Sequence, residues 1–149
     1  TASLIANSAR AAGVLSGLPS SQLDALYRFG RQLGLAFQVV DDILDFTGSD
    51  QQLGKPAASD LASGYLTAPA LYALEERPSL AGLIEREFSE DGDLDQALEL
   101  VRNSQAIQRS RALAEGFANE AREAISWLPS SESRSALLAL PEFVLSRLY

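Results

Sequence analysis

Cysteine, histidine and methionine are all absent from this chain of 149 residues. Without cysteine the chain forms no disulfide and offers no thiolate to a metal ion. Without histidine it lacks the commonest general base and the commonest transition-metal ligand. Any chemistry must therefore use carboxylates, lysine, arginine, hydroxyls and amides, a set of groups that suits magnesium and phosphate better than zinc.

Basic residues are also few, because 12 Lys and Arg stand against 20 Asp and Glu and give a net charge of −8. With no basic cluster, this balance argues against nucleic-acid binding. No apolar run approaches the length of a transmembrane segment, and no signal peptide is visible. The opening residues Thr1 to Ile5 read as the middle of a helix with no preceding cap, so we expect a fragment or processed piece.

The hydrophobic spacing predicts an all-α chain, most simply a single domain over residues 1–149 or part of one. We expect a first helix over Ala2–Leu15, ended by Gly17 and Pro19, and a second from Ser20 or Ser21 to Phe46. Gly30 and Gly34 lie one turn apart inside this second helix, which suggests the close approach of another helix or a ligand.

The second half of the chain reads as shorter helices separated by turns. A turn-rich connection from Gly48 to Ala58 precedes a helical turn at Asp60 and Leu61. Thr67 and Ser79 are expected as N-caps, and Ser79 begins an amphipathic helix that includes Phe88. Asp93 and Gln96 are expected to form a capping pair for the next helix. A long helix is expected over Gln105–Leu128, followed by a last helix that starts at Ser131 and is interrupted by Pro141.

Residues 37–45 (FQVVDDILD) place three carboxylates in an otherwise apolar segment. On an α-helix Gln38, Asp41, Asp42 and Asp45 fall within an arc of about 100°. From Leu33 to Phe46 these Asp residues are the only charged ones, whereas an ordinary solvated face carries mixed charges. A buried helix with one acidic stripe predicts a cavity wall that holds a hard divalent cation, with Mg²⁺ as the first choice.

The segments FQVVDDILD at 37–45, GKPAASDL at 54–61 and LTAP at 66–69 resemble the C-terminal half of the trans-isoprenyl diphosphate synthases. The chain is most similar to the long-chain, solanesyl-type enzymes of cyanobacteria and plastids. The similarity runs from Thr1 to Arg147, and an aspartate-rich motif followed about ten residues later by Gly-Lys is specific.

The resemblance implies the C-terminal part of a terpenoid-synthase helical bundle, in which two aspartate-rich motifs hold Mg²⁺ on an allylic diphosphate. Asp41, Asp42 and Asp45 match the second motif and its metal ligands, with Asp41 and Asp42 as catalytic residues. Lys55 matches a catalytic lysine that binds the allylic diphosphate. Gln38 and Thr1 match substrate-binding residues of the cavity. The first motif and the isopentenyl diphosphate site lie upstream of Thr1 in that family.

By the same resemblance, the complete enzyme condenses an allylic prenyl diphosphate with isopentenyl diphosphate, acts as a homodimer, and lies in the cyanobacterial cytoplasm or the plastid stroma. The chain alone is expected to be inactive. The alternative function is a non-catalytic helical partner subunit of a prenyltransferase. One departure from the family is Ala58, which stands where Gly is usual and would be strained if φ is positive there.

Overall fold

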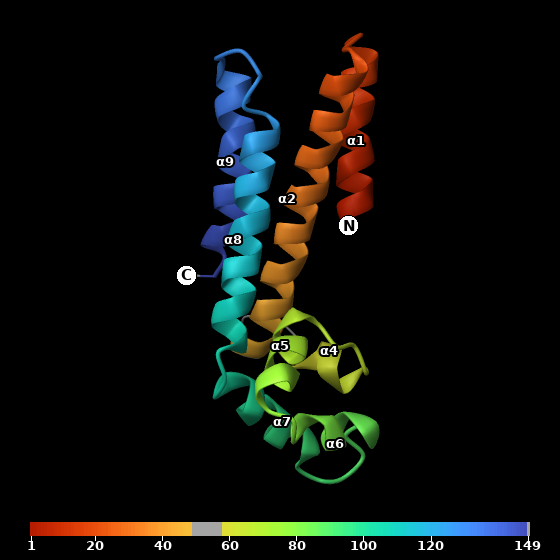
Figure 1. Cartoon of the computed structure of the whole chain (residues 1–149), viewed down its shortest axis with the longest axis vertical. Coiled ribbons are helices and arrows are strands. Elements are labelled where there is room, and N and C mark those ends of the chain that lie inside the picture. The colour runs from red at the N-terminus through yellow and green to blue at the C-terminus, as the bar shows by residue number, and fades with distance from the viewer. Residues whose placement is uncertain (49–57, 149) are drawn as a thin grey trace. The chain divides into compact units, whose positions relative to one another are not determined.

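The computed structural model describes residues 1–48 and 58–148, and in these ranges every regular element is helical, as predicted (Figure 1). The helices are α1 (Ala2–Leu15), α2 (Ser20–Thr47), α4 (Ser59–Ala62), α5 (Ala68–Glu76), α6 (Leu80–Glu85), α7 (Asp93–Arg102), α8 (Ala106–Ala124) and α9 (Glu132–Ser146). None of these described helices is both long and apolar enough to cross a membrane.

The chain divides into two compact units. The first unit contains Thr1–Val40 and Leu113–Tyr149, and the second contains Asp41–Ala112. The prediction of a single domain stays a prediction.

The first two helices begin and end close to the predicted residues. Helix α1 covers Ala2–Leu15, and Gly17 then adopts φ +68°, a left-handed conformation that glycine takes at little cost. The Leu18 N–H donates to the Gly13 carbonyl at 3.1 Å, which closes the turn. Helix α2 covers 28 residues and ends at Thr47, one residue beyond the predicted end.

Helix α1 packs directly on α2 through the two glycines of α2 (Figure 1). A Cβ atom on Gly30 would lie 2.6 Å from the Ile5 carbonyl oxygen, and one on Gly34 would lie 2.5 Å from the Ala2 Cα. Both neighbours are backbone atoms of α1, so neither can move aside alone. The expectation of close packing is confirmed, and the partner is a helix.

Helices α8 and α9 complete the first unit. The Gln32 amide on α2 donates to the Glu120 carboxylate on α8. The Arg147 guanidinium, just beyond α9, lies 4.8 Å from the centre of the Phe37 ring. The face of α8 toward this unit's core carries small side chains that are fully buried, namely Ala114, Ala118 and Ala121. The unit is thus held by apolar burial with polar contacts added along α2.

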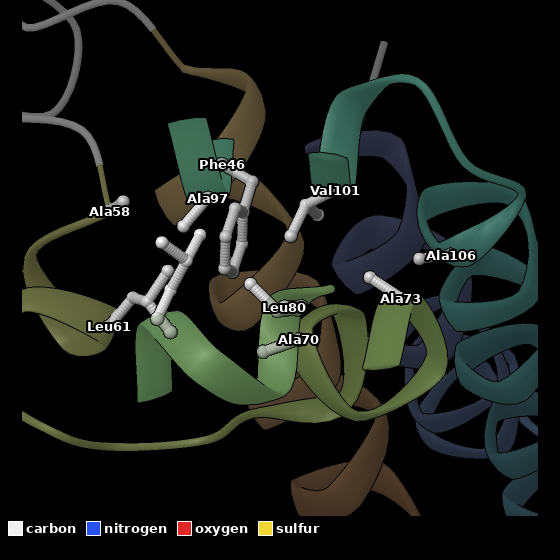
Figure 2. Packing of buried hydrophobic residues seen from close by; sticks show 10 residues of the cluster. Phe46, Ala58, Leu61, Ala70, Ala73, Leu80, Ala97, Val101 and Ala106 are labelled. Atoms are coloured by element: carbon white, nitrogen blue, oxygen red, sulfur yellow. The ribbon is translucent and has the colours of Figure 1, made fainter. Parts of the chain in front are cut away.

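The second unit has its own hydrophobic core around Phe46, near the C-terminal end of α2 (Figure 2). Every helix of the unit contributes a buried side chain, and the core comprises Phe46, Ala58, Leu61, Ala70, Ala73, Leu80, Leu83, Ala97, Val101 and Ala106. Arg102 donates from Nε and Nη2 to the Phe46 carbonyl oxygen at 3.1 and 3.0 Å. The guanidinium thereby satisfies a carbonyl that the last turn of α2 leaves without a helical partner.

Several local predictions were wrong. Asp93 does not pair with Gln96 as a cap, because its carboxylate binds Arg86 through two contacts of 2.6 and 2.8 Å, and the N-cap of α7 is Gly92. Helix α6 stops at Glu85, so that Phe88 follows it with φ +54°. Helix α9 runs through Pro141, whose ring is fully buried and packed. Thr67 and Ser79 hold their predicted cap positions but make no side-chain cap bond.

Candidate functional site

The acidic stripe occupies the last two turns of α2 and becomes more buried toward the end of the helix. Asp41 is half-buried, Asp42 is 8% exposed and Asp45 is 2% exposed. Their immediate neighbours Val40 and Ile43 are fully buried. The prediction that this part of the helix is buried is therefore confirmed at Asp42 and Asp45, and the prediction that the stripe faces a metal-binding cavity stays a prediction. Gln38, one turn before Asp41, is exposed.

Asp45 fixes the start of α4 through both carboxylate oxygens. The Ser59 hydroxyl donates to Oδ1 at 3.0 Å, and the Asp60 N–H donates to Oδ2 at 3.1 Å. The Asp45 main-chain carbonyl accepts from the Ala58 N–H at 2.8 Å. Three consecutive residues therefore bond to one residue of α2, and all lie in the second compact unit.

Ala58 has a positive φ, the condition under which an alanine at this position is expected to be strained. Its φ and ψ are 54° and 32°, in the left-handed region, and its side chain is fully buried. Such a conformation costs an L-residue about 1–2 kcal/mol and costs glycine little. Its N–H bond to Asp45 and the packed core around it hold the residue in place.

The structure gives no test of the predicted roles of Thr1 and Lys55. Thr1 is exposed at the N-cap of α1, where its carbonyl accepts from the Leu4 and Ile5 N–H groups, and it belongs to the first unit. Lys55 lies outside the described residues. Within residues 1–48 and 58–148, no group of three or more His, Cys, Asp or Glu side chains is arranged to hold a metal ion. The metal and substrate roles of these residues stay predictions.

Sequence reasoning missed two features of the site. Arg102 reaches the end of α2 from 56 positions away, and helical periodicity carries no signal for such a pairing. No feature of the sequence distinguishes Ser59 within the GKPAASDL segment, yet its hydroxyl donates to the Asp45 carboxylate. The second unit also holds a cavity of about 420 Å³ that contains no predicted site residue and is lined by Ala62, Ser63, Gly64, Leu66, Ile84, Glu87 and Phe88.

The family model for polyprenyl synthetase matches residues 1–101, a range that includes α1, the acidic stripe and all of the second unit's core except Ala106. The chain belongs to the polyprenyl synthetase family. Its all-helical structure is that of the terpenoid-synthase fold, which its structural relatives share.

Curated members of the family are similar over the whole chain. A prenyl transferase of Synechocystis is 59% identical over 149 residues, which are 100% of this chain and 46% of that protein. The chloroplastic solanesyl diphosphate synthase 2 of Arabidopsis thaliana is 49% identical over 99% of this chain and 36% of its own length. The chain thus spans about half the length, or less, of the curated relatives it matches.

Solved structures of the family agree closely with this fold. The apo form of an Arabidopsis medium/long-chain length prenyl pyrophosphate synthase superposes with a TM-score of 0.89 at 43% identity, over 100% of this chain and 52% of that chain. A polyprenyl synthase from Caulobacter crescentus, complexed with calcium and isoprenyl diphosphate, gives a TM-score of 0.88 at 35% identity, over 100% of this chain and 47% of the other.

Proposed function

We propose that this chain is the part of a magnesium-dependent polyprenyl diphosphate synthase that carries the second aspartate-rich motif. The observation that supports this most is the family match over residues 1–101, because it includes two adjacent aspartates in an apolar stretch of α2, one of them 8% exposed. In the proposed reaction the allylic diphosphate loses its diphosphate, the double bond of isopentenyl diphosphate forms a carbon–carbon bond to the allylic carbon, and a proton leaves.

The donor groups present fit magnesium. Mg²⁺ is commonly held by one or two carboxylates, several waters and substrate phosphates, so Asp41, Asp42 and Asp45 are suitable ligands on this side of a site that another aspartate-rich motif would complete. The Caulobacter relative, which binds calcium and isoprenyl diphosphate, favours the same assignment, because calcium is also a hard cation with oxygen ligands. When bound, the ion would supply positive charge for the departing diphosphate.

The other proposed roles belong to residues of the chain itself. Lys55 would bind the allylic diphosphate, and Gln38 and Thr1 would line the cavity that contains the prenyl chain. Apolar side chains around the stripe, such as Val40 and Ile43, would keep water away from the reacting carbon. A location in a cyanobacterial cytoplasm or plastid stroma is favoured by the Synechocystis and chloroplastic relatives. A homodimer is proposed from the family resemblance alone.

A chimera tests the function directly. The matched segment of the Synechocystis relative is replaced by this chain, and prenyl transfer from an allylic diphosphate to labelled isopentenyl diphosphate is measured with Mg²⁺. The chimera is expected to be active, and sedimentation of the same protein checks the dimer. A folded but inactive chimera would favour the alternative, a non-catalytic partner subunit.

Asp41→Asn in this chimera tests the metal assignment. The substitution keeps the shape of the side chain and removes its charge, so the rate is expected to fall about a hundredfold or more. The metal-free protein should melt at the same or a higher temperature, because like-charge repulsion on α2 is reduced. Asp24→Asn is the control, since Asp24 is exposed and its ion pair with Arg10, at 3.6 Å, lies at the surface. A destabilised metal-free variant with a normal rate would contradict the assignment.

A further inference from the structure

The cavity of the second unit is lined from two sides, by residues at and after the end of α4 and by residues at and after the end of α6. Its volume is about 420 Å³, and Glu87 is the only charged residue among the described residues that line it. The half-buried side chains of Leu66, Ile84 and Phe88 give it apolar walls. A ligand that fits this lining combines an apolar part with a positive charge.

The turn after α6 presents Glu87 and Phe88 to the cavity in a strained conformation. Their φ values are 56° and 54°, in the left-handed region, which costs an L-residue about 1–2 kcal/mol. The turn is held by the Arg86 guanidinium, which binds the Asp93 carboxylate at 2.6 and 2.8 Å, and by the Phe88 N–H, which donates to the Leu83 carbonyl at 3.1 Å. This wall of the cavity is therefore fixed in advance of any ligand.

The charge around the cavity is negative. Residues 41–112, the second unit, contain 14 Asp and Glu against 6 Lys and Arg, so this unit carries the whole net charge of −8. Half of those acidic residues lie within residues 85–99, where Arg86 is the only basic residue and already pairs with Asp93. Glu87 is exposed, and its carboxylate has no hydrogen bond or ion pair within the described part of the chain. A cation that approaches this surface is attracted toward the cavity.

We propose that the cavity is a docking site for a basic segment of another protein, which inserts an arginine side chain between α4 and α6. The methylene stem lies against Leu66, Ile84 and Phe88, and the guanidinium pairs with Glu87. Tyr65 is 67% exposed and stands next to a lining residue in the sequence, so its ring is a second contact for the cation. The proposed prenyl transfer gives none of these residues a role, so the two proposals stand or fall separately.

The test uses the chain itself and a fluorescein-labelled peptide of about twelve residues built from Arg-Leu-Ala repeats. Fluorescence anisotropy measures binding at an ionic strength of about 0.15 M, where distant surface charges are largely screened. Glu87→Gln is expected to weaken binding about tenfold, because the paired carboxylate is lost. Glu85→Gln is the matched control, an equal change of charge at an exposed position outside the lining. It should weaken binding less than about twofold.

A second pair of variants tests the shape of the site. Ser63 is exposed and lines the cavity, so Ser63→Phe fills it and is expected to abolish saturable binding. Ser89→Phe makes the same substitution at an exposed position outside the lining and should leave binding unchanged. Circular dichroism melts check that both variants are folded. A peptide with citrulline in place of arginine needs no variant, and it should not bind, because citrulline is neutral.

Five results would overturn the proposal. Absence of saturable binding by the arginine peptide rejects the site. Equal weakening by Glu87→Gln and Glu85→Gln assigns the binding to diffuse charge, and unchanged binding by Ser63→Phe places it elsewhere. Equal binding of the citrulline peptide removes the role of charge. Spermine that displaces the peptide at concentrations as low as those of unlabelled peptide identifies a small polyamine, in place of a protein segment, as the ligand.

Discussion

At the scale of single residues, the informative position is Ala58. Ala58 stands where the family usually has glycine, and its φ of 54° lies in the left-handed region. The left-handed conformation of Ala58 could be anticipated, because a glycine at the matching position of the family indicates a positive φ. The partner of Asp45 could not be anticipated in the same way, because Ser59 lies 14 positions away in the sequence.

Ala58→Gly is expected to change the free energy of unfolding by less than about 1 kcal/mol, although Ala58 is fully buried. Relief of the left-handed strain offsets the loss of a buried methyl group. The matched control is Ala73→Gly, because Ala73 is fully buried in the same core but lies inside α5. There the losses of helix propensity and of burial add to about 1.5–2 kcal/mol. Urea unfolding of both variants measures the difference, and equal losses would contradict the strain.

The ion pair of Arg86 and Asp93 is a second feature that local sequence rules did not predict. The sequence around Asp93 predicts a cap with Gln96, but the carboxylate binds Arg86 seven positions earlier and accepts the Glu90 N–H at 3.2 Å. The hydrogen bond from Arg86 lowers the pKa of Asp93 below its ordinary value. A charged donor in reach competes successfully with a neutral cap.

This pKa shift predicts a loss of stability in acid. Because the pKa of Asp93 is lower in the folded state than in the unfolded state, its contribution is present above the unfolded value of about 3.9 and is lost as the pH falls through the folded value. Asp93→Asn should therefore flatten the decline in stability below about pH 4, whereas Asp91→Asn, at an exposed position of the same turn, should not. Thermal melts across this range measure the effect, and matching profiles for both variants would contradict it.

At the scale of elements, the sequence pattern predicts where helices begin and end better than it predicts how their residues pack. The bounds of α1 and α2 agree with the predicted ones within one residue, because glycine, proline and serine mark the ends and the apolar spacing is regular. The continuation of α9 through Pro141 was missed, since a proline removes its own N–H bond but a fully buried ring regains packing energy that the sequence does not display.

Gly30→Ala is expected to destabilise the chain by about 1–3 kcal/mol, although alanine is the better helix former. The added methyl would meet the α1 backbone at 2.6–2.8 Å, so α1 must shift. Gly116→Ala is the control inside α8, because nothing lies within 4 Å of its added Cβ. It should gain up to about 1 kcal/mol from helix propensity alone. Opposite signs in urea unfolding support the packing, and a gain in both variants would contradict it.

At the scale of the whole molecule, the family and the fold class follow from the sequence, whereas the completeness of the site does not. The acidic stripe lies on a described helix, yet the described residues contain no group of three or more acidic, His or Cys side chains arranged for a metal ion. Several large apolar side chains are exposed in the first unit, among them Leu4 at 74%, Leu15 at 90% and Phe143 at 68%.

The isolated chain of 149 residues is therefore expected to show no prenyl transfer, even with Mg²⁺ and both substrates at concentrations that saturate the chimera. One aspartate-rich motif supplies too few carboxylates for the proposed diphosphate site. The measurement is label incorporation by equal molar amounts of the chain and the chimera. Turnover by the chain at a rate near that of the chimera would contradict the assignment of half a site.

The glycines of α2 also constrain the turn that precedes that helix. Ala2 and Ala6 of α1 lie four positions apart, as Gly30 and Gly34 do, so the two helices meet in a single register. One residue deleted between Ser16 and Pro19 would shorten the connection, and a compensating shift of α1 by one residue would rotate its small face by about 100° and direct larger side chains at the glycines. A shift of one full turn would bring Arg10 opposite Gly30. The length of a short surface turn is thereby coupled to two glycines more than ten residues away.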